Sequence, residues 1–304
     1  MTKTLLLAAL VAVVTAASAC ENSNPESTNA VVSVVTTNNI TEDWVRRIGG
    51  NRVEVLSLVP PGADPHTFQP GARDMTRLAD ADVVFSIGLG LEKRWLKDML
   101  NTDSSNSGLI IALGDAIGPI NKESRTTEVL DPHFWFDPLR VKLAISEIAL
   151  TLTALDPTGA ETYRDNSITY LLELDELHAW AQATLNTVPA DRRVLITSHD
   201  TLGYFALRYG YQIIGTIIPE ITTGTEISAK NLTELIDTVI KQGVPAIFVE
   251  NTTNDRMATR VAEEADVVAI SSMYTGSLSR HGEGADTYVN MMRSNVTTIA
   301  EALR

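Results

Sequence analysis

Residues 30–37 read Ala-Val-Val-Ser-Val-Val-Thr-Thr, an unbroken run dominated by β-branched side chains. A run without polar alternation is typical of a parallel strand that is buried on both faces. We expect a helix next, from Ile40 to Gly49, with Thr41 as its N-cap and Gly49-Gly50 as its stop signal. A buried strand followed directly by a helix is the repeating unit of an α/β protein with a parallel sheet.

The same alternation continues through the first half of the chain. Further strands are expected at Val53–Val59, Ala81–Ile87 and Leu109–Leu113, and further helices at Ala72–Ala79 and Leu91–Leu100. A polar loop is expected from there to His133. Helices that connect parallel strands cover both faces of the sheet, and ligands of such sheets bind beyond the carboxyl ends of the strands.

A long amphipathic segment separates the two halves of the chain. After a helix expected at about Leu139–Leu155, Asp156 and Pro157 supply an N-cap and a first-turn proline. Apolar residues then recur at spacings of three and four, at Leu171, Leu174, Leu177, Ala181, Leu185 and Val188. One helix over the 32 positions from Pro157 to Val188 would be about 48 Å long. We interpret it as a rigid strut, with two shorter helices broken near Asn166 as the alternative.

Strand and helix signals alternate again in the last third of the chain. Strands are expected at Val194–Thr197, Gln212–Ile217, Ala246–Val249 and Val267–Ser271. Helices are expected near Thr201–Tyr209, Ala229–Gln242, Asp255–Ala265 and Ala285–Leu303. A chain of 304 residues also exceeds the usual size of a single core.

We therefore predict an α/β fold of two lobes, each a mostly parallel sheet flanked by helices. The lobes are expected at residues 30–155 and 189–304, and the helix at residues 156–188 joins them. Both lobes offer side chains from loops at strand ends, so the expected ligand site is the cleft between the lobes. Glu226 and Glu250 are acidic residues that could face this cleft.

The first 29 residues are expected to lie outside the folded body. Lys3, the apolar run 5–14 and Ala17-Ser18-Ala19 follow the order of regions in an export signal, which predicts a signal peptide over residues 1–19. The only cysteine, Cys20, follows directly, and Ala-Ser-Ala-Cys resembles a lipobox, in which the cysteine is lipidated. Ordinary cleavage beside an incidental cysteine is the alternative. Residues 20–29, rich in Ser, Asn, Pro and Thr, would form a flexible tether.

These features predict an exported protein, in the periplasm or anchored by a lipid on Cys20 to the outer face of the cell membrane. The formal net charge of −14 argues against nucleic acid as a partner, because phosphate binding requires a concentrated positive face. Apart from the signal, the sequence has no apolar run near the ~20 residues that a membrane span needs.

Three of the five histidines occur in similar surroundings, beside prolines or after a hydrophobic run. The stretches are Pro-Pro-Gly-Ala-Asp-Pro-His66, Asp-Pro-His133-Phe-Trp-Phe-Asp-Pro and Thr-Ser-His199-Asp-Thr-Leu-Gly. A lone histidine is more often a surface or packed residue than a ligand, and we expect this of His178 on the long helix. Three histidines at turns that present side chains indicate instead a metal site assembled by folding.

Nearby acidic residues could orient the second nitrogen of each ring, as commonly occurs at metal centres. The candidates are Asp64, Asp131 and Asp200, together with backbone carbonyls.

Several ordered motifs together resemble one family, and the resemblance covers essentially the whole chain after the signal. The motifs are Pro-Gly-Ala-Asp-Pro-His-Thr-Phe-Gln-Pro at 61–70, Ala-Asp-Val-Val-Phe at 81–85, Gly-Leu-Gly-Leu-Glu at 88–92, Trp95-Leu96, the stretches around His133 and His199, and Ala-Asp-Thr-Tyr at 285–288. They resemble the metal-binding substrate-binding proteins of bacterial zinc and manganese ABC importers. The resemblance implies two four-stranded lobes joined by one long helix, with a metal in the cleft and little hinge closure. It also implies that a membrane permease is the partner, and we expect a monomer.

Residue by residue, the resemblance makes His66, His133 and His199 three of four metal ligands. Family members usually carry an aspartate in a segment similar to Leu-Tyr-Val-Asp-Ser-Leu-Ser, where this chain reads Met273-Tyr-Thr-Gly276-Ser-Leu-Ser279. Because a glycine side chain has no ligand atom, either water or a neighbouring group would complete the metal's coordination. The local candidates are His281, Glu283 and Asp286.

Three neutral imidazoles favour Zn²⁺ over Mn²⁺, which prefers oxygen ligands and higher coordination numbers. In the family, a histidine at the position of His199 is commoner in zinc binders, and Mn²⁺ is the alternative cargo. Protons compete for imidazole, so metal affinity is expected to fall below about pH 6.5.

The leading function is capture of Zn²⁺ outside the inner membrane or cell membrane and delivery to an ABC permease, without catalysis. A zinc hydrolase that activates water at an open fourth position is one alternative, although the sequence contains no His-Glu-x-x-His motif. Binding of an organic chelate is the other alternative, and it predicts an aromatic-lined cleft that would include Phe134, Trp135 and Phe136.

Overall fold

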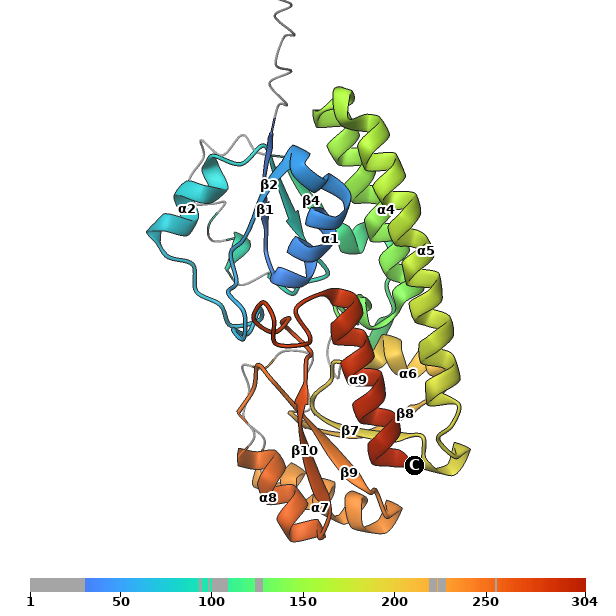
Figure 1. Ribbon diagram of the computed structural model, residues 1–304. Helices are drawn as coiled ribbons and strands as arrows, with labels where there is room; N and C mark the ends of the chain where they lie inside the picture. The colour runs from blue at the N-terminus through green and yellow to red at the C-terminus, as the bar shows by residue number, and fades with distance from the viewer. Residues whose placement is uncertain are drawn as a thin grey trace, which may run out of the picture.

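The computed structural model describes residues 31–92, 95–97, 99, 109–123, 128–218, 223, 228–254 and 256–304. The described part folds into two α/β lobes that are stacked end to end, with a long helix running along one side of both (Figure 1). The predicted fold class is confirmed. The predicted signal peptide, Cys20 and the predicted tether lie outside the described residues.

A four-stranded parallel sheet forms the centre of the first lobe, with strand order β2-β1-β3-β4. The strands are β1 (Val32–Thr36), β2 (Val53–Ser57), β3 (Val83–Ser86) and β4 (Leu109–Ala112). The loops after β1 and β2 face the second lobe, since Asn39 and Gly62 both hydrogen-bond the side chain of Ser277 there. The carboxyl ends of the strands therefore point towards the junction between the lobes.

The second lobe contains a parallel sheet with strand order β10-β9-β7-β8. Its strands are β7 (Val194–His199), β8 (Gln212–Ile218), β9 (Ala246–Glu250) and β10 (Val268–Met273). Strand β7 includes His199 as its last residue, so the strand ends two residues later than the predicted end at Thr197. The backbone of His199 is thus held by pairing with Ile218 of β8.

Helices α1 (Asn39–Gly49) and α2 (Ala72–Ala79) follow β1 and β2, and α4 (Pro138–Leu155) closes the first half of the chain. The N-cap of α1 is Asn38 and not Thr41, because the Asn38 side chain accepts a hydrogen bond from the Thr41 backbone N–H at 2.9 Å. The helix ends where Gly50 takes a φ of 56°, a left-handed value that favours glycine.

One uninterrupted helix, α5 (Ala160–Leu185), joins the lobes and packs against α1, α4 and α9 (Figure 1). Its 26 residues make it about 39 Å long, shorter than expected because Asp156 caps a separate short turn, Pro157–Gly159. The alternative of a break near Asn166 was wrong. The apolar stripe faces inwards: Leu174, Leu177, Ala181, Leu185 and Val188 are buried.

The second lobe carries α6 (Gly203–Tyr209), α7 (Ala229–Gln242), α8 (Arg256–Ala265) and α9 (Tyr288–Leu303). Helix α9 starts at the junction between the lobes and runs beside α5 to the C-terminus (Figure 1). No helix among the described residues is long and apolar enough to cross a membrane.

Two short antiparallel strands, β5 (Asn121–Glu123) and β6 (Glu128–Leu130), precede His133. The expectation of a plain polar loop here was wrong. The helix expected at Leu91–Leu100 falls partly outside the described residues.

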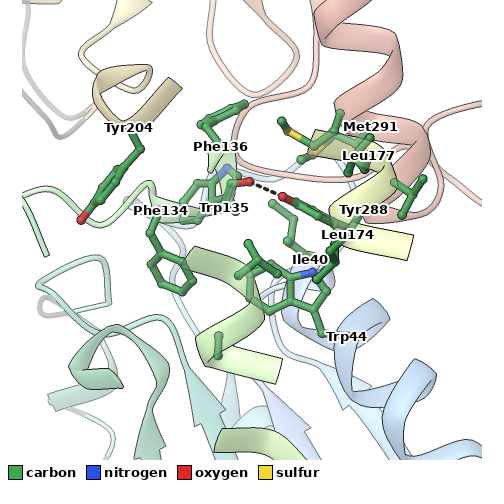
Figure 2. Packing of buried hydrophobic residues seen from close by; sticks show 14 of the residues in the cluster. Ile40, Trp44, Phe134, Trp135, Phe136, Leu174, Leu177, Tyr204, Tyr288 and Met291 are labelled. Carbon is green, nitrogen blue, oxygen red and sulfur yellow. Dashed lines mark hydrogen bonds between the residues drawn. The ribbon is translucent and has the colours of Figure 1, made fainter. Parts of the chain in front are cut away.

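The aromatic residues that follow His133 pack into the main hydrophobic core at the lobe junction (Figure 2). Phe134, Trp135 and Phe136 are fully buried in a short 3-10 turn. The hydroxyl of Tyr288 donates to the Trp135 carbonyl at 2.7 Å, and Trp135 Nε1 donates to the carbonyl of Thr275 at 2.8 Å. These bonds attach the His133 segment to the second lobe, so these aromatics fix the position of His133 and do not line an open cleft.

Candidate metal centre

The three predicted histidines come from three separate parts of the fold and meet at the junction between the lobes. His66 lies in the loop between β2 and α2, His133 immediately precedes the turn Phe134–Phe136, and His199 ends β7. All three side chains are buried, with 5 % or less of each residue exposed. Folding therefore brings together residues that are 67 and 66 positions apart in sequence.

The ring nitrogens converge on one point. Nε2 of His133 lies 3.1 Å from Nε2 of His66 and 3.2 Å from Nε2 of His199. One nitrogen from each ring lies within 4.8 Å of the other two, and among the described residues no further histidine, cysteine or acidic residue joins this group. Nitrogens about 3.3 Å apart are corners of a tetrahedron whose centre lies about 2.0 Å from each, which is the Zn–N bond length. A small change in side-chain torsions would therefore accommodate an ion.

Carboxylates hold two of the three rings from behind. Asp131 Oδ1 lies 2.8 Å from Nδ1 of His133 and also accepts from the His133 backbone N–H at 2.9 Å. Glu250 Oε2 lies 2.7 Å from Nδ1 of His199. When Nδ1 donates to a carboxylate, Nε2 keeps its lone pair for a metal. Asp131 and Glu250 thus fix the orientation of the His133 and His199 rings.

The predicted orienting residues were therefore right only for Asp131. Glu250, expected only to face the cleft, takes the role that was predicted for Asp200. Asp64 accepts from the backbone N–H of His66 at 2.9 Å and not from its ring. Nδ1 of His66 is buried without a hydrogen-bond partner among the described residues. Glu226 lies outside the described residues.

Burial and neighbouring charges give the three rings different proton affinities. Burial, together with the two neighbouring histidines, holds the pKa of His66 well below 6.5, and burial also lowers the pKa of His133. Burial lowers the pKa of His199 too, but the Glu250 carboxylate outweighs this effect and the net pKa is raised. Two of the three rings therefore stay neutral, as metal ligation requires, over most of the physiological pH range.

Gly276 is buried close to the histidines' loops, and its surroundings leave little room for a side chain. A Cβ at this position would lie 3.1 Å from Cδ of Pro65 and 3.4 Å from Oγ1 of Thr252. His281, Glu283 and Asp286, the candidates for the fourth metal ligand, do not belong to the group of ligand atoms that lie within 4.8 Å of one another. His281 is fully exposed and pairs with Asp286 at 3.3 Å, and Glu283 accepts from the backbone N–H of Arg280. Three histidines are thus the donor set that the described residues provide.

The similarity to known proteins extends over the whole folded body. The family model described as zinc-uptake complex component A, periplasmic, matches residues 34–302. A manganese-binding lipoprotein of Halalkalibacterium halodurans is 31% identical over 294 residues, covering 97% of this chain and 96% of that protein. A manganese ABC transporter substrate-binding lipoprotein of Streptococcus pneumoniae is 29% identical over 304 residues, covering 98% of this chain and 97% of that protein.

Solved structures agree with the sequence relatives. The periplasmic zinc-binding protein of Treponema pallidum superposes with a TM-score of 0.83 at 29% identity, covering 90% of this chain and 99% of that chain. A manganese-bound periplasmic metal-binding protein from Candidatus Liberibacter asiaticus superposes with a TM-score of 0.80 at 27% identity, covering 90% of this chain and 100% of that chain. The chain therefore belongs to the family of zinc-uptake complex component A proteins, the metal-binding substrate-binding proteins of ABC importers.

Proposed function

We propose that His66, His133 and His199 bind one Zn²⁺ ion as cargo and that the protein delivers this ion to the permease of an ABC importer. The observation that carries the proposal is the convergence of three buried imidazole nitrogens within 4.8 Å. A buried donor set of this kind selects an ion by its preference for nitrogen ligands.

The choice of zinc rests on the donor atoms. Three imidazoles without a carboxylate in the group suit Zn²⁺, which takes four ligands, better than Mn²⁺, which prefers six and favours oxygen. The relatives do not decide between the two metals, because one similar structure is a zinc-binding protein and another is manganese-bound, and the two sequence relatives are named for manganese. Water in the fourth position would complete a tetrahedral zinc site.

The first 29 residues support a location outside the cytoplasm. The two sequence relatives are named a manganese-binding lipoprotein and a manganese ABC transporter substrate-binding lipoprotein, and in this chain Cys20 directly follows the predicted signal. We propose that a lipid on Cys20 anchors the protein outside the cytoplasm, with residues 20–29 as the tether. Mass spectrometry of the membrane fraction would show a diacylglycerol mass on the N-terminal cysteine, and Cys20→Ser would release the protein into the soluble fraction.

Metal analysis tests the choice of cargo. Protein purified without added metal is expected to contain about one zinc per chain by inductively coupled plasma mass spectrometry, and a tenfold excess of Mn²⁺ should not displace it. His133→Ala should remove the bound metal, because it deletes the central ring. His281→Ala, which removes an exposed histidine, is the matched control and should retain zinc. Stoichiometric manganese in the purified protein would overturn the assignment of zinc, and metal retention by His133→Ala would overturn the three-histidine site.

A further inference from the structure

Helix α6 contacts the segment that carries His133 and directly follows the strand that carries His199. The helix spans only Gly203–Tyr209, and it begins four residues after the end of β7. It packs against β8 and against the 3-10 turn Phe134–Phe136, beside which Figure 2 shows Tyr204. One short helix therefore lies against the elements that present two of the three histidines.

Tyr204 holds the chain on the N-terminal side of His133. Its hydroxyl donates to the backbone carbonyl of Asp131 at 2.8 Å and accepts from the backbone N–H of Ile120 at 3.2 Å. Tyr204 is only 1% exposed, so bulk water does not compete for these bonds. The carboxylate of the same Asp131 lies 2.8 Å from Nδ1 of His133. Tyr204 thus fixes the backbone from which the carboxylate that orients His133 projects.

Arg208 holds the chain on the C-terminal side of the same segment. It lies one helical turn after Tyr204, so both side chains extend from one face of α6. Its Nε and Nη2 donate to the two carboxylate oxygens of Asp137 at 2.8 and 2.7 Å, a bidentate pair of fixed geometry. Asp137 is buried and also caps α4 by accepting from the backbone N–H of Leu139. Its other ion-pair partner among the described residues, Arg140, is further away at 3.5 Å.

The beginning of α6 is tied to His199. The backbone N–H of Thr201 donates to the His199 carbonyl at 2.9 Å, and the hydroxyl of Thr197 donates to the same carbonyl at 2.6 Å. A shift of α6 would therefore move both ends of the His133 segment relative to His199. The Nε2 atoms of these two rings are 3.2 Å apart. Since Zn–N bonds are about 2.0 Å long and metal sites tolerate changes of only about 0.2 Å, a small shift would disturb the site.

We propose that Tyr204 and Arg208 are positioning residues of the metal site, which hold His133 at the distance from His199 at which one ion can bind both rings. The proposal rests on the three-histidine site proposed above. Neither residue belongs to the group of ligand atoms that converge there. Each acts through an aspartate that lies beside His133 in the chain, one before it and one after it.

Two measurements test the proposal. Competition with a chromophoric chelator at pH 7.5 gives the zinc affinity, and the visible spectrum of the Co²⁺-loaded protein reports the coordination geometry. Tyr204→Phe, which removes only the hydroxyl, and Arg208→Gln should each weaken zinc binding by about tenfold, as changes around metal ligands commonly do. Each should also shift the Co²⁺ bands. Arg208→Lys keeps the charge without the bidentate geometry and should recover part of the lost affinity.

Matched variants separate positioning from general effects on the protein. Tyr209→Phe removes a hydroxyl from the same helix that has no hydrogen-bond partner among the described residues. Arg164→Gln removes an exposed positive charge from α5. Both should bind zinc as the unmodified protein does. Val261→Ala creates a cavity in a separate core cluster of the second lobe, so it should lower the Tm and leave the Co²⁺ spectrum unchanged.

The outcomes distinguish this proposal from the one on which it rests. Unchanged zinc affinity in Tyr204→Phe or in Arg208→Gln would overturn the role of α6, and so would the same spectral shift in Val261→Ala, because loss of stability would then explain the effect. If only the role of α6 is wrong, His133→Ala still loses the metal. If the three-histidine site is wrong, His133→Ala retains it.

Discussion

Glu250 and His199 form a buried pair that links β9 to β7: Oε2 of the carboxylate lies 2.7 Å from Nδ1 of the ring, and Oε1 accepts from the His199 backbone N–H at 2.8 Å. The hydroxyl of Thr275 donates to the same carboxylate at 2.6 Å. Burial alone would raise the pKa of Glu250, but the charge of His199 outweighs burial and the net pKa is lowered. The carboxylate therefore stays ionised and holds the ring with Nε2 directed at His133.

Glu250→Gln is expected to weaken zinc binding by about 10- to 100-fold, because an amide replaces the anionic acceptor that orients His199. Competition with a chromophoric zinc chelator at pH 7.5 measures the change. Glu176→Gln makes the same substitution on an exposed face of α5 and should leave affinity unchanged. Equal affinity of Glu250→Gln and the unmodified protein would show that the ring is oriented without the carboxylate.

The pH dependence of metal binding should reflect His199 first. Its pKa is raised above 6.5, so the metal-free site holds a proton there as pH falls, whereas His66 and His133 have lowered pKa values and remain neutral. We expect the zinc association constant to fall by about tenfold per pH unit once His199 is protonated, which corresponds to release of one proton per ion bound. Zinc titrations between pH 5.5 and 8 measure the slope. A slope of three protons across this range would contradict the different proton affinities of the rings.

The order of strands and helices could be predicted because its signals are local. Buried β-branched runs marked the strands to within about two residues, and α2 and α7 have the predicted bounds. The N-cap of α1 was misplaced because Asn38 and Thr41 are both good capping residues three positions apart. The hairpin β5-β6 was missed because its polar segments show no clear alternation.

The three histidines of the candidate site could be predicted from the sequence, and so could Asp131 behind His133, but the partner of His199 could not. Each histidine sits in a distinctive local stretch, which a reader of the sequence can find. The partner of His199 is Glu250, 51 residues away, and this pairing depends on β9 lying next to β7 in the sheet. Strand order is a tertiary property, so the sequence favoured the adjacent Asp200 instead.

Asn39 connects the lobes through a pair of hydrogen bonds with the backbone of Leu278. Its Oδ1 accepts from the Leu278 N–H at 3.0 Å, and its Nδ2 donates to the Leu278 carbonyl at 3.3 Å and to Ser277 Oγ at 3.1 Å. Asn39→Ala would leave these buried groups unpaired, so we expect a loss of about 2–4 kcal/mol in the free energy of unfolding. Urea denaturation measures it, with Asn231→Ala on the exposed face of α7 as the control. A loss no larger than that of the control would show that the lobes do not depend on this contact.

Asp43 is the acidic side chain on α1 that accepts a hydrogen bond from the Tyr288 backbone N–H at 2.9 Å, at the start of α9. Burial raises its pKa to about 6, while this hydrogen bond and Arg47 act in the opposite direction and Glu173 and Asp286 add to the rise. Between about pH 4 and pH 6, Asp43 is therefore protonated to a greater extent in the folded protein than in the unfolded chain. Protonation of Asp43 stabilises the fold as pH falls through this range, and the stabilisation is absent above about pH 6.

Asp43→Asn is accordingly expected to stabilise the protein at pH 7.5, because the amide is neutral and its oxygen still accepts from Tyr288. A shift of about two pKa units corresponds to at most about 3 kcal/mol, and partial exposure of the carboxyl reduces this to about 1–2 kcal/mol. Thermal unfolding should show a higher Tm for the variant at pH 7.5 and a difference that shrinks below pH 5. Asp237→Asn, an exposed change on α7, should show neither effect. A variant less stable than the unmodified protein at pH 7.5 would mean that the charge of Asp43 is needed at the start of α9, where an ionised carboxylate favours the helix N-terminus more than burial opposes it.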